Sequence, residues 1–467
     1  MKISFEAGDA RRTLVLALFA DKDVQGVTPD IAEPLAPLLA SRDKDQPVDL
    51  LLPTEGGMRR IIVLRADSAT PLAAEALGAR IAGLPVAAGA DVLDLLVPAC
   101  PVLAGHVALG ARLSAYRYTR FRTSPPKGPA RPAGLNLPHG DAAAFEGLAA
   151  LAEGVEWARD LSNAPPNAMV PALFVQECRA LADLGVTVEV LEEAELRRLG
   201  MGALLGVGQG SAAPPAIAIL RWQGVADGGA PLVLAGKGVT FDSGGLLPKQ
   251  AEEMWDMKYD RAGAAAVAGA IRALALRRSP VDVVGIVGLA ENMPSGGAQR
   301  PGDIVTSHAG LTVEVLHTDA EGRLLLADVL SYAIDRFNPR AIIDIATLTG
   351  GLTSVLTDRF GGLYANDDEL AARLTRLGDG VGERLWRLPL DPAFTRMLDS
   401  PVADLGNICK TRWGGTATAA AFLHRFVGGV PWAHLDIFGP AWNRGSAGVP
   451  GATGYGVRLL TALAEAG

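Results

Sequence analysis

Cysteine is scarce in this chain, whose 467 residues include only Cys100, Cys178 and Cys409. Their odd number and wide spacing give no sign of a disulfide framework or of a zinc site made of thiolates. Proteins of the cytoplasm use cysteine in this sparing way because thiols stay reduced there. We therefore expect a cytoplasmic protein.

Long apolar runs and basic clusters are missing as well. No stretch approaches the ~20 uninterrupted apolar residues of a membrane-spanning helix, so we expect no membrane partner. Arg11 and Arg12 precede a short apolar run at 14–20, but Glu6 and Asp9 lie before it. A buried first strand fits that pattern better than an export signal. Acidic residues outnumber basic ones by 51 to 43, which argues against a nucleic-acid partner.

The composition is that of a globular protein, with 49% hydrophobic and 20% charged residues and a length suited to two or three domains. We predict a small α/β domain over 1–140, a linker helix over 141–165 and a larger domain over 166–467. Within the first domain, residues 123–140 are rich in Pro, Arg and Gly and indicate a linker. The other predicted elements of this domain are strands at 14–19, 61–64 and 92–97 and helices at 71–84 and 102–118.

Strand and helix patterns alternate through the second domain, which predicts an α/β domain around a largely central sheet. In such folds the functional residues lie at strand ends and in the loops that leave them. The predicted elements are a helix at 142–161 leading in, helices at 171–184, 194–199 and 262–278, and strands at 186–191, 216–222, 232–235, 281–289 and 341–346.

Two carboxylates and a guanidinium are closely spaced within residues 316–328. Asp319, Glu321 and Arg323 alternate along the chain, and an extended backbone would place all three on one face. Carboxylates so placed can hold a divalent cation, and the planar arginine can hold a small anion. A solvated acidic turn that caps the following helix is the other interpretation.

A second group of charged residues lies upstream, at Lys237, Asp242, Lys249 and Asp260. The flanking glycines allow close approach of the backbone to a ligand, yet the order Gly-Lys-Gly lacks the hydroxyl of a phosphate-binding loop. With the acidic pair downstream, the set suits a two-metal hydrolase in which carboxylates bridge two ions. A buried lysine beside cations loses its proton and can bind metal, and a charged lysine can polarise a carbonyl.

Six motifs in one order resemble those of the leucine (cytosol) aminopeptidase family, over roughly residues 155–460. The first 150 or so residues match that family only in size and in being α/β. The motifs are Gly-Lys-Gly-Val-Thr-Phe-Asp-Ser-Gly-Gly at 236–245, Met-Lys-Tyr-Asp at 257–260, Glu-Asn-Met-Pro-Ser-Gly at 291–296, Arg-Pro-Gly-Asp at 300–303, Thr-Asp-Ala-Glu-Gly-Arg-Leu at 318–324 and Asp-Ile-Ala-Thr-Leu-Thr-Gly at 344–350.

The resemblance implies a metal-dependent aminopeptidase that removes the N-terminal residue of short peptides, using a water that bridges two metal ions. Its fold would be a small α/β domain and a zinc-exopeptidase-like α/β domain with a central mixed sheet. One ion would be bound by Lys237, Asp242, Asp260 and Glu321, and the other by Asp242, Asp319 and Glu321. Zinc or manganese is expected, and magnesium or cobalt is compatible with these ligands.

The resemblance also implies roles for residues outside the metal ligands. Lys249 would polarise the peptide carbonyl, and Arg323 would hold a bicarbonate ion as general base. Thr347, Leu348 and Gly350 match the stretch that lines the substrate pocket. The family assembles as a homo-hexamer, so the same is expected here.

The chain departs from the family pattern at a few positions around these motifs. His317 replaces an Asn, and a hydrogen-bonding replacement is favoured over a pH-sensitive group. Pro248 and Gln250 flank Lys249 where the family has an aliphatic residue and a proline, which leaves the direction of Lys249 open. Arg261 replaces a Met and could narrow or charge the floor of the pocket.

The sequence leaves two alternatives to a peptidase. A mainly non-catalytic scaffold or DNA-binding regulator is disfavoured by the acidic balance of the chain. A nucleotide enzyme that uses the turn at 236–245 would need nucleotide binding that survives removal of metal, which we do not expect.

Overall fold

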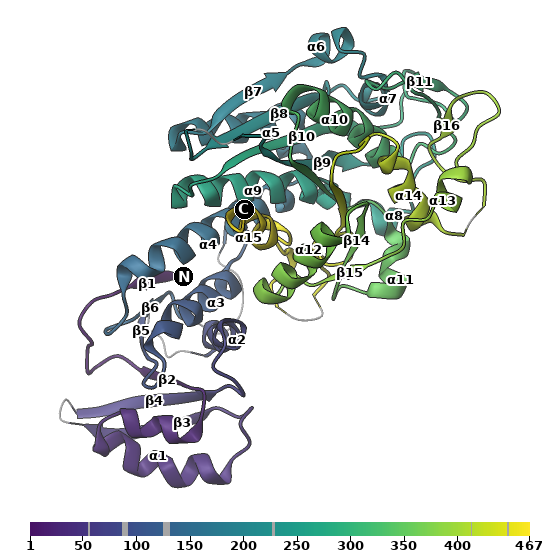
Figure 1. Ribbon diagram of the computed structural model, residues 1–467. Coiled ribbons are helices and arrows are strands. Elements are labelled where there is room, and N and C mark those ends of the chain that lie inside the picture. Colours follow the sequence, from purple (N-terminus) through teal and green to yellow (C-terminus); the bar gives the residue numbers. More distant parts are fainter. Residues whose placement is uncertain (55–56, 86–91, 125–130, 227–228, 412, 446–447) are drawn as a thin grey trace. The chain divides into compact units, whose positions relative to one another are not determined.

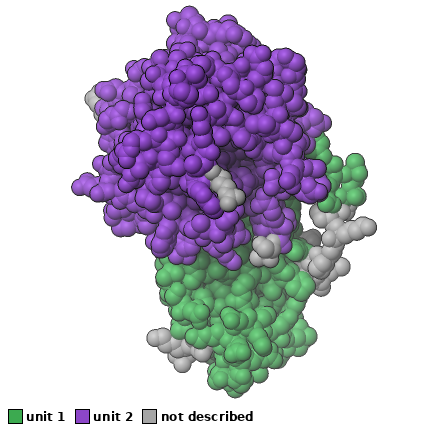
Figure 2. Space-filling model, turned by 90° about the vertical axis from the view of Figure 1, so that its right-hand side faces the viewer, with its two compact units in different colours: residues 1–152 green, residues 153–467 purple. Residues whose placement is uncertain are grey.

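The computed structural model describes residues 1–54, 57–85, 92–124, 131–226, 229–411, 413–445 and 448–467. The chain forms two compact units, Met1–Ala152 and Glu153–Gly467 (Figure 2). The division falls within α4 (Ala142–Asn163). The bounds of α4 confirm the helix predicted at 142–161. None of the described helices has the length and apolar character needed to cross a bilayer.

Unit 1 is built on a six-stranded sheet with the order β1-β6-β5-β2-β4-β3, in which only the β3–β4 pair is antiparallel. Both faces carry apolar clusters of buried side chains. Its elements are β1 (Lys2–Ser4), β2 (Leu14–Leu18), α1 (Pro29–Ser41), β3 (Val48–Thr54), β4 (Gly57–Arg65), α2 (Pro71–Ala82), β5 (Val92–Leu96), α3 (Ala104–Ala115) and β6 (Gly134–Asn136).

The predicted strands and helices of unit 1 are confirmed, but the predicted linker at 123–140 is wrong in part. Residues 134–136 form β6, which pairs with β1 on one side and β5 on the other. A three-residue strand is too short to show a period of two, so composition alone suggested a loop. Residues 125–130 of that predicted linker lie outside the described residues.

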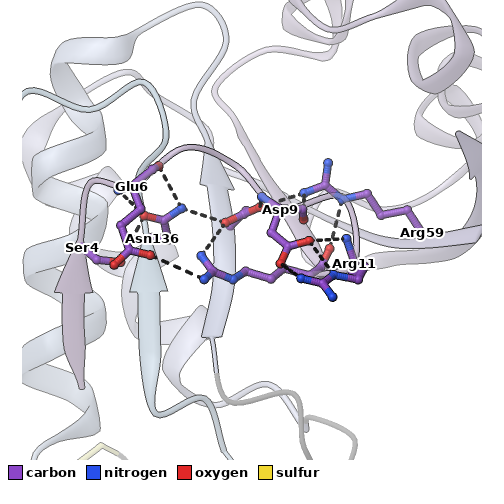
Figure 3. A network of polar contacts seen from close by, with 8 residues as sticks. Ser4, Glu6, Asp9, Arg11, Arg59 and Asn136 are labelled. Carbon is purple, nitrogen blue, oxygen red and sulfur yellow. Dashed lines mark hydrogen bonds and ion pairs between the residues drawn. The ribbon is translucent and has the colours of Figure 1, made fainter. Parts of the chain in front are cut away.

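A polar network in unit 1 includes Ser4, Asp9, Arg59 and Asn136 (Figure 3). It surrounds the fully buried Asp94 of β5. Its carboxylate accepts hydrogen bonds from Asn136 Nδ2 at 2.9 Å, Arg59 Nη2 at 2.9 Å and the backbone N–H of Asp9 at 3.0 Å. Ser4 Oγ in turn donates to Asn136 Oδ1 at 3.0 Å. A buried carboxylate is stable only with such partners, and here they hold the segment after β1 against the sheet.

Unit 2 contains an eight-stranded mixed sheet with the order β15-β14-β17-β13-β9-β10-β8-β7, which confirms the predicted central mixed sheet. The four neighbours β17, β13, β9 and β10 are parallel to one another. The strands are β7 (Thr187–Leu191), β8 (Ala216–Gln223), β9 (Leu232–Asp242), β10 (Asp282–Asn292), β13 (Ala341–Ala346), β14 (Gly361–Ala365), β15 (Leu385–Arg387) and β17 (Trp432–Asp436).

Helices and three-residue or shorter strands complete unit 2. Strand β12 lies between β11 and β16 in a small sheet, and β18 pairs with β19. These elements are α5 (Pro171–Arg179), α6 (Glu193–Arg198), α7 (Gly202–Gly208), α8 (Ala251–Met254), α9 (Ala262–Arg277), β11 (Ile304–Thr306), β12 (Thr312–Glu314), α10 (Glu321–Phe337), α11 (Thr353–Leu356), α12 (Asp368–Val381), α13 (Pro392–Arg396), β16 (Leu405–Gly406), α14 (Gly415–His424), β18 (Trp442–Asn443), β19 (Gly451–Ala452) and α15 (Val457–Glu465).

Helices α9 and α10 cover opposite faces of the central sheet (Figure 1). Adjacent residues of β9 show this directly, because successive side chains point to opposite faces. A Cβ on Gly236 would lie 2.7 Å from Cα of Ala264 in α9, whereas the side chain of Lys237 reaches Gly322 in α10. A Cβ on Gly322 would lie 2.6 Å from Lys237 Cε, so glycine leaves room for the lysine there.

The parallel strands end together at one edge of this sheet. Asp242, Asn292 and Asp436 are the last residues of β9, β10 and β17, and Thr347 follows β13 directly. Carboxyl ends of parallel strands are where open α/β sheets place their ligands. Of the charged residues singled out in the sequence, Asp242 therefore lies at a strand end, as expected.

Candidate active site

Lys237 lies inside β9 with 2% of its surface exposed. Its Nζ is 2.7 Å from Asp260 Oδ1, 2.8 Å from Glu321 Oε1 and 2.9 Å from the carbonyl oxygen of Thr347. Burial alone would lower the pKa of this ammonium group, but the neighbouring carboxylates outweigh it and raise the pKa. The contacts join three distant segments of the chain at one buried nitrogen.

Lys249 makes a second lysine–carboxylate group at the same edge of the sheet. Its Nζ is 2.8 Å from Asp242 Oδ2 and 2.5 Å from Asp319 Oδ1. The loop that carries it turns back on itself, since Lys249 N donates to Ser243 O at 2.9 Å. Despite the altered flanking residues Pro248 and Gln250, Lys249 therefore points at the carboxylates.

Asp319 and Glu321 meet, but not through the extended backbone on which the sequence argument relied. Asp319 lies in a turn, and Glu321 is the first residue of α10. Oxygen atoms of Asp242, Asp319 and Glu321 all lie within 4.8 Å of one another. The turn followed by a helix start brings the carboxylates together, and Glu321 also occupies the helix N-terminus, where negative charge is favourable.

Asn292 is a site residue that the sequence argument did not single out. Its Nδ2 donates to Asp242 Oδ1 at 2.8 Å and to Thr318 O at 3.0 Å, and Gly244 N also donates to Asp242 Oδ1 at 2.9 Å. These bonds occupy one carboxylate oxygen of Asp242 and leave the other facing Lys249. Asn292 lies in a motif that carries the family resemblance, which was the available signal.

The segment after β13 contains Thr347, Leu348 and Gly350, and it contacts the same cluster. Thr347 Oγ1 donates to Asp260 Oδ1 at 2.8 Å, while its carbonyl oxygen accepts from Lys237. Leu348 is half-buried and Gly350 is exposed. The segment therefore has one end fixed in the carboxylate–lysine cluster and the other end open to solvent.

Asp436, at the end of β17, binds the segment after β13 through hydrogen bonds. Its fully buried carboxylate accepts from Leu348 N at 3.1 Å, Thr349 N at 3.1 Å and Thr349 Oγ1 at 2.5 Å. Burial raises the pKa of Asp436, and these donors oppose the shift. The strand pattern around Asp436 gave no reason to separate it from the core.

Arg323 is buried in the first turn of α10 and does not converge with Asp319 and Glu321 in a direct contact. Its Nη1 donates to the carbonyl oxygen of Asn407 at 2.8 Å, and its buried Nε has no hydrogen-bond partner among the described residues. Burial lowers the pKa of Arg323 to about 10, so the guanidinium remains charged at neutral pH.

Arg261 does not form the pocket floor, which corrects one expectation from the sequence. Its guanidinium is fully buried and donates to the carbonyl oxygens of Thr240 at 2.6 Å and Leu161 at 2.8 Å, and also to that of Ala164. A planar group with five N–H donors suits such a set of carbonyls. Arg261 thus fastens the end of α4 to β9.

His317 acts as a hydrogen-bonding residue in the turn, in agreement with the favoured interpretation. Asp319 N donates to His317 Nδ1 at 3.2 Å. Burial lowers the pKa of His317, which keeps Nδ1 available as an acceptor at neutral pH.

The residues of this cluster fit divalent metal ions. Four carboxylates, from Asp242, Asp260, Asp319 and Glu321, face two lysine ammonium groups, which leaves an excess of negative charge in a buried place. Asp260 Oδ2 and Glu321 Oε2 are buried and have no hydrogen-bond partner among the described residues. Burial raises the pKa of Asp319 to about 7, and the neighbouring Asp242 and Glu321 add to the rise. Oxygen-rich ligands with unused lone pairs are what hard and borderline cations require.

Comparisons with known proteins identify the family of this chain. A model of the cytosol aminopeptidase family, catalytic domain, matches residues 156–461. The chain belongs to the cytosol aminopeptidase family. A probable cytosol aminopeptidase of Caulobacter vibrioides is 45% identical over 433 residues, covering 90% of this chain and 87% of the relative. One from Brucella ovis is 50% identical over 369 residues, covering 77% and 74%.

A solved structure extends the similarity to nearly the whole chain. The bottromycin maturation enzyme BotP in complex with Mn superposes with a TM-score of 0.85 at 36% identity, covering 98% of this chain and 99% of BotP. The predicted fold class and family are confirmed: this member of the cytosol aminopeptidase family is a metal-dependent aminopeptidase that acts on peptides. Neither alternative, scaffold or nucleotide enzyme, gains support.

Asp436 offers a test of how this aminopeptidase holds the segment after β13. Asp436→Ala leaves the N–H groups of Leu348 and Thr349 without an acceptor, at about 1–3 kcal/mol for each unsatisfied donor. We expect a lower free energy of unfolding in urea and a higher KM for leucine amide. Asp436→Asn keeps one acceptor oxygen and should lose less; equal stability of the alanine variant and the parent would contradict this role.

Proposed function

We propose that two divalent ions are held by the cluster at the carboxyl ends of the parallel strands. Lys237, Asp242, Asp260 and Glu321 would bind one ion, and Asp242, Asp319 and Glu321 the other. The observation that carries the proposal is the approach of Asp242, Asp319 and Glu321 oxygens within 4.8 Å of one another. Bound there, the ions would lower the pKa of a shared water and make it a nucleophile at neutral pH.

The identity of the ions is proposed from the donor set. Carboxylate oxygens with one lysine nitrogen suit zinc or manganese, and magnesium or cobalt is compatible. Lys237 would bind through its neutral amine, since two nearby cations oppose its proton. With 2% exposure it is shielded from bulk water, which suits a ligand better than a substrate-binding group.

Lys249 is proposed to act on the substrate. Its side chain is 14% exposed, against 2% for Lys237, so it is the more accessible of the two lysines. A charged ammonium group near the scissile carbonyl would stabilise the negative charge that develops on its oxygen. Thr347, Leu348 and Gly350 would line the pocket for the first residue, supported by the exposure that rises along this segment.

Arg323 is proposed to hold bicarbonate as a proton acceptor for the nucleophilic water. The guanidinium stays charged, and its Nε–H has no partner among the described residues. A planar guanidinium can bind the oxygens of a small anion in a forked arrangement.

The remaining proposals concern the whole protein. We propose residues 166–467 as the catalytic domain, with 1–140 as an N-terminal domain and 141–165 as the helix between them. Short peptides are the proposed substrates. A cytoplasmic location is proposed as well, and the three free cysteines support it. The family resemblance supports a homo-hexamer.

Replacing Lys249 tests the proposed chemistry. Lys249→Met should lower kcat for leucine amide by about 10²–10³-fold, the usual effect of removing one charge-stabilising donor. KM should change little, because the lysine would act mainly on charge that develops during the reaction. Lys44→Met removes the same charge from an exposed position in unit 1 and is the matched control. An unchanged kcat for Lys249→Met would refute the role.

A further inference from the structure

Asn407, which follows β16, is fully buried beside the turn that leads into α10. Its Oδ1 accepts from the backbone N–H groups of Leu316 at 2.8 Å and His317 at 3.2 Å. Its Nδ2 donates to His317 O at 2.7 Å and lies 3.4 Å from Ala320 O. A single side chain thus binds both ends of the turn that carries Asp319.

The backbone of Asn407 also forms hydrogen bonds, through both its N–H group and its carbonyl oxygen. Its N–H donates to Glu314 O at 2.9 Å, which continues the parallel pairing of β12 with β16. Its carbonyl oxygen accepts from Arg323 Nη1 at 2.8 Å. The residue therefore links the small sheet, the Asp319 turn and Arg323 through its hydrogen bonds.

We infer that Asn407 is a positioning residue of the aminopeptidase reaction, which fixes Arg323 relative to Asp319 and Glu321. The inference rests on the proposed roles of those three residues and assigns to Asn407 no contact with substrate. Buried groups that orient ligands through hydrogen bonds commonly affect both metal affinity and activity.

The amide is suited to this place because it accepts and donates at once. Aspartate has the same size and could accept from Leu316 and His317, but it cannot donate to His317 O. Asn407→Asp would therefore place a carboxylate oxygen against a carbonyl oxygen. Asn407→Ala would remove all the side-chain bonds and leave the buried turn without its partners.

Asp404 provides a matched control on the same segment. Its Oδ2 accepts from Thr312 N at 2.7 Å and from Thr312 Oγ1 at 2.8 Å, so it too fastens this segment to β12. Unlike Asn407, it is exposed and contacts neither the Asp319 turn nor Arg323 through any described bond. A purely structural role for the segment would make both residues behave alike.

The test compares Asn407→Ala and Asn407→Asp with Asp404→Ala in the full-length protein. We expect kcat for leucine amide to fall about 10–100-fold in both Asn407 variants, with a smaller change in KM. Affinity for MnCl2, measured by calorimetric titration of metal-free protein, should fall as well. Asp404→Ala should lose thermal stability but keep kcat and manganese affinity.

A double-mutant cycle with Arg323→Ala asks whether Asn407 acts through the arginine. If it does, adding Asn407→Asp to Arg323→Ala should reduce kcat far less than it does in the parent protein. The inference would be overturned if the double variant lost kcat by the product of the two single losses. It would also be overturned if the Asn407 variants retained kcat and manganese affinity. Should Asn407→Ala not fold, Asn407→Asp carries the same comparison. Failure of the proposed metal site would instead show as a parent protein that binds no manganese.

Discussion

Glu321→Gln should reduce kcat/KM for leucine amide on the order of 10⁴-fold, the scale seen when a central catalytic group is removed. Glu321 is, with Asp242, one of the two carboxylates shared by both proposed ions, and its Oε1 lies 2.8 Å from Lys237 Nζ. Glutamine keeps the shape of the side chain but removes the charge on which ion binding depends. The loss should therefore appear in activity without a comparable loss of folded structure.

Glu252→Gln is the matched control for this substitution, because Glu252 is exposed on α8, a short way along the chain from Lys249. It should retain the kcat/KM of the parent. Circular dichroism of both variants separates lost chemistry from lost folding. A Glu321→Gln enzyme with parental activity would be incompatible with Glu321 as a bridging ligand.

Removal of metal should abolish hydrolysis and also lower the melting temperature. Four carboxylates face only two lysines in the buried cluster, so bound cations relieve repulsion that otherwise destabilises the folded state. Ligand at 100 times its Kd stabilises a protein by about 2.7 kcal/mol. Each kcal/mol shifts the melting temperature of a domain of about 150–250 residues by roughly 2–4 °C. The shift per kcal/mol is smaller for a larger domain such as unit 2, so a rise of a few degrees is expected.

The measurement is a thermal melt and a leucine amide assay after dialysis against a chelator, repeated after addition of MnCl2 or ZnCl2. Both activity and melting temperature should recover. Asp242→Ala serves as the control, because it should show no metal-dependent shift. Full activity in the presence of chelator would contradict the metal dependence of the mechanism.

Much of the fold of unit 2 could be predicted because its strands are buried on both faces. The run at 341–346 is wholly apolar apart from Asp344 and was predicted with the bounds that β13 has. The small-residue run at 262–278 likewise predicted α9 to within one residue. Continuous apolar or small-residue runs of the right length make such elements predictable without tertiary information.

The missed features depend on contacts between residues far apart in the sequence. Asn407 and Asp436 are ordinary polar residues in their own segments, and their importance appears only where they meet residues 316–323 and 347–349. The orientation of the Arg261 guanidinium could not be predicted either, because it binds backbone carbonyl oxygens of residues 161, 164 and 240, which come from two other segments. The convergence of Asp319 and Glu321 was expected for the wrong reason, since a turn and a helix start produce it.

Crystals grown with MnCl2 would test the central claim most directly, through anomalous scattering from manganese. The account predicts two anomalous peaks per chain, both in contact with Asp242 and Glu321, one also near Asp260 and Lys237 and the other near Asp319. Absence of any anomalous peak there, with Asp242 and Glu321 turned away from each other, would contradict it.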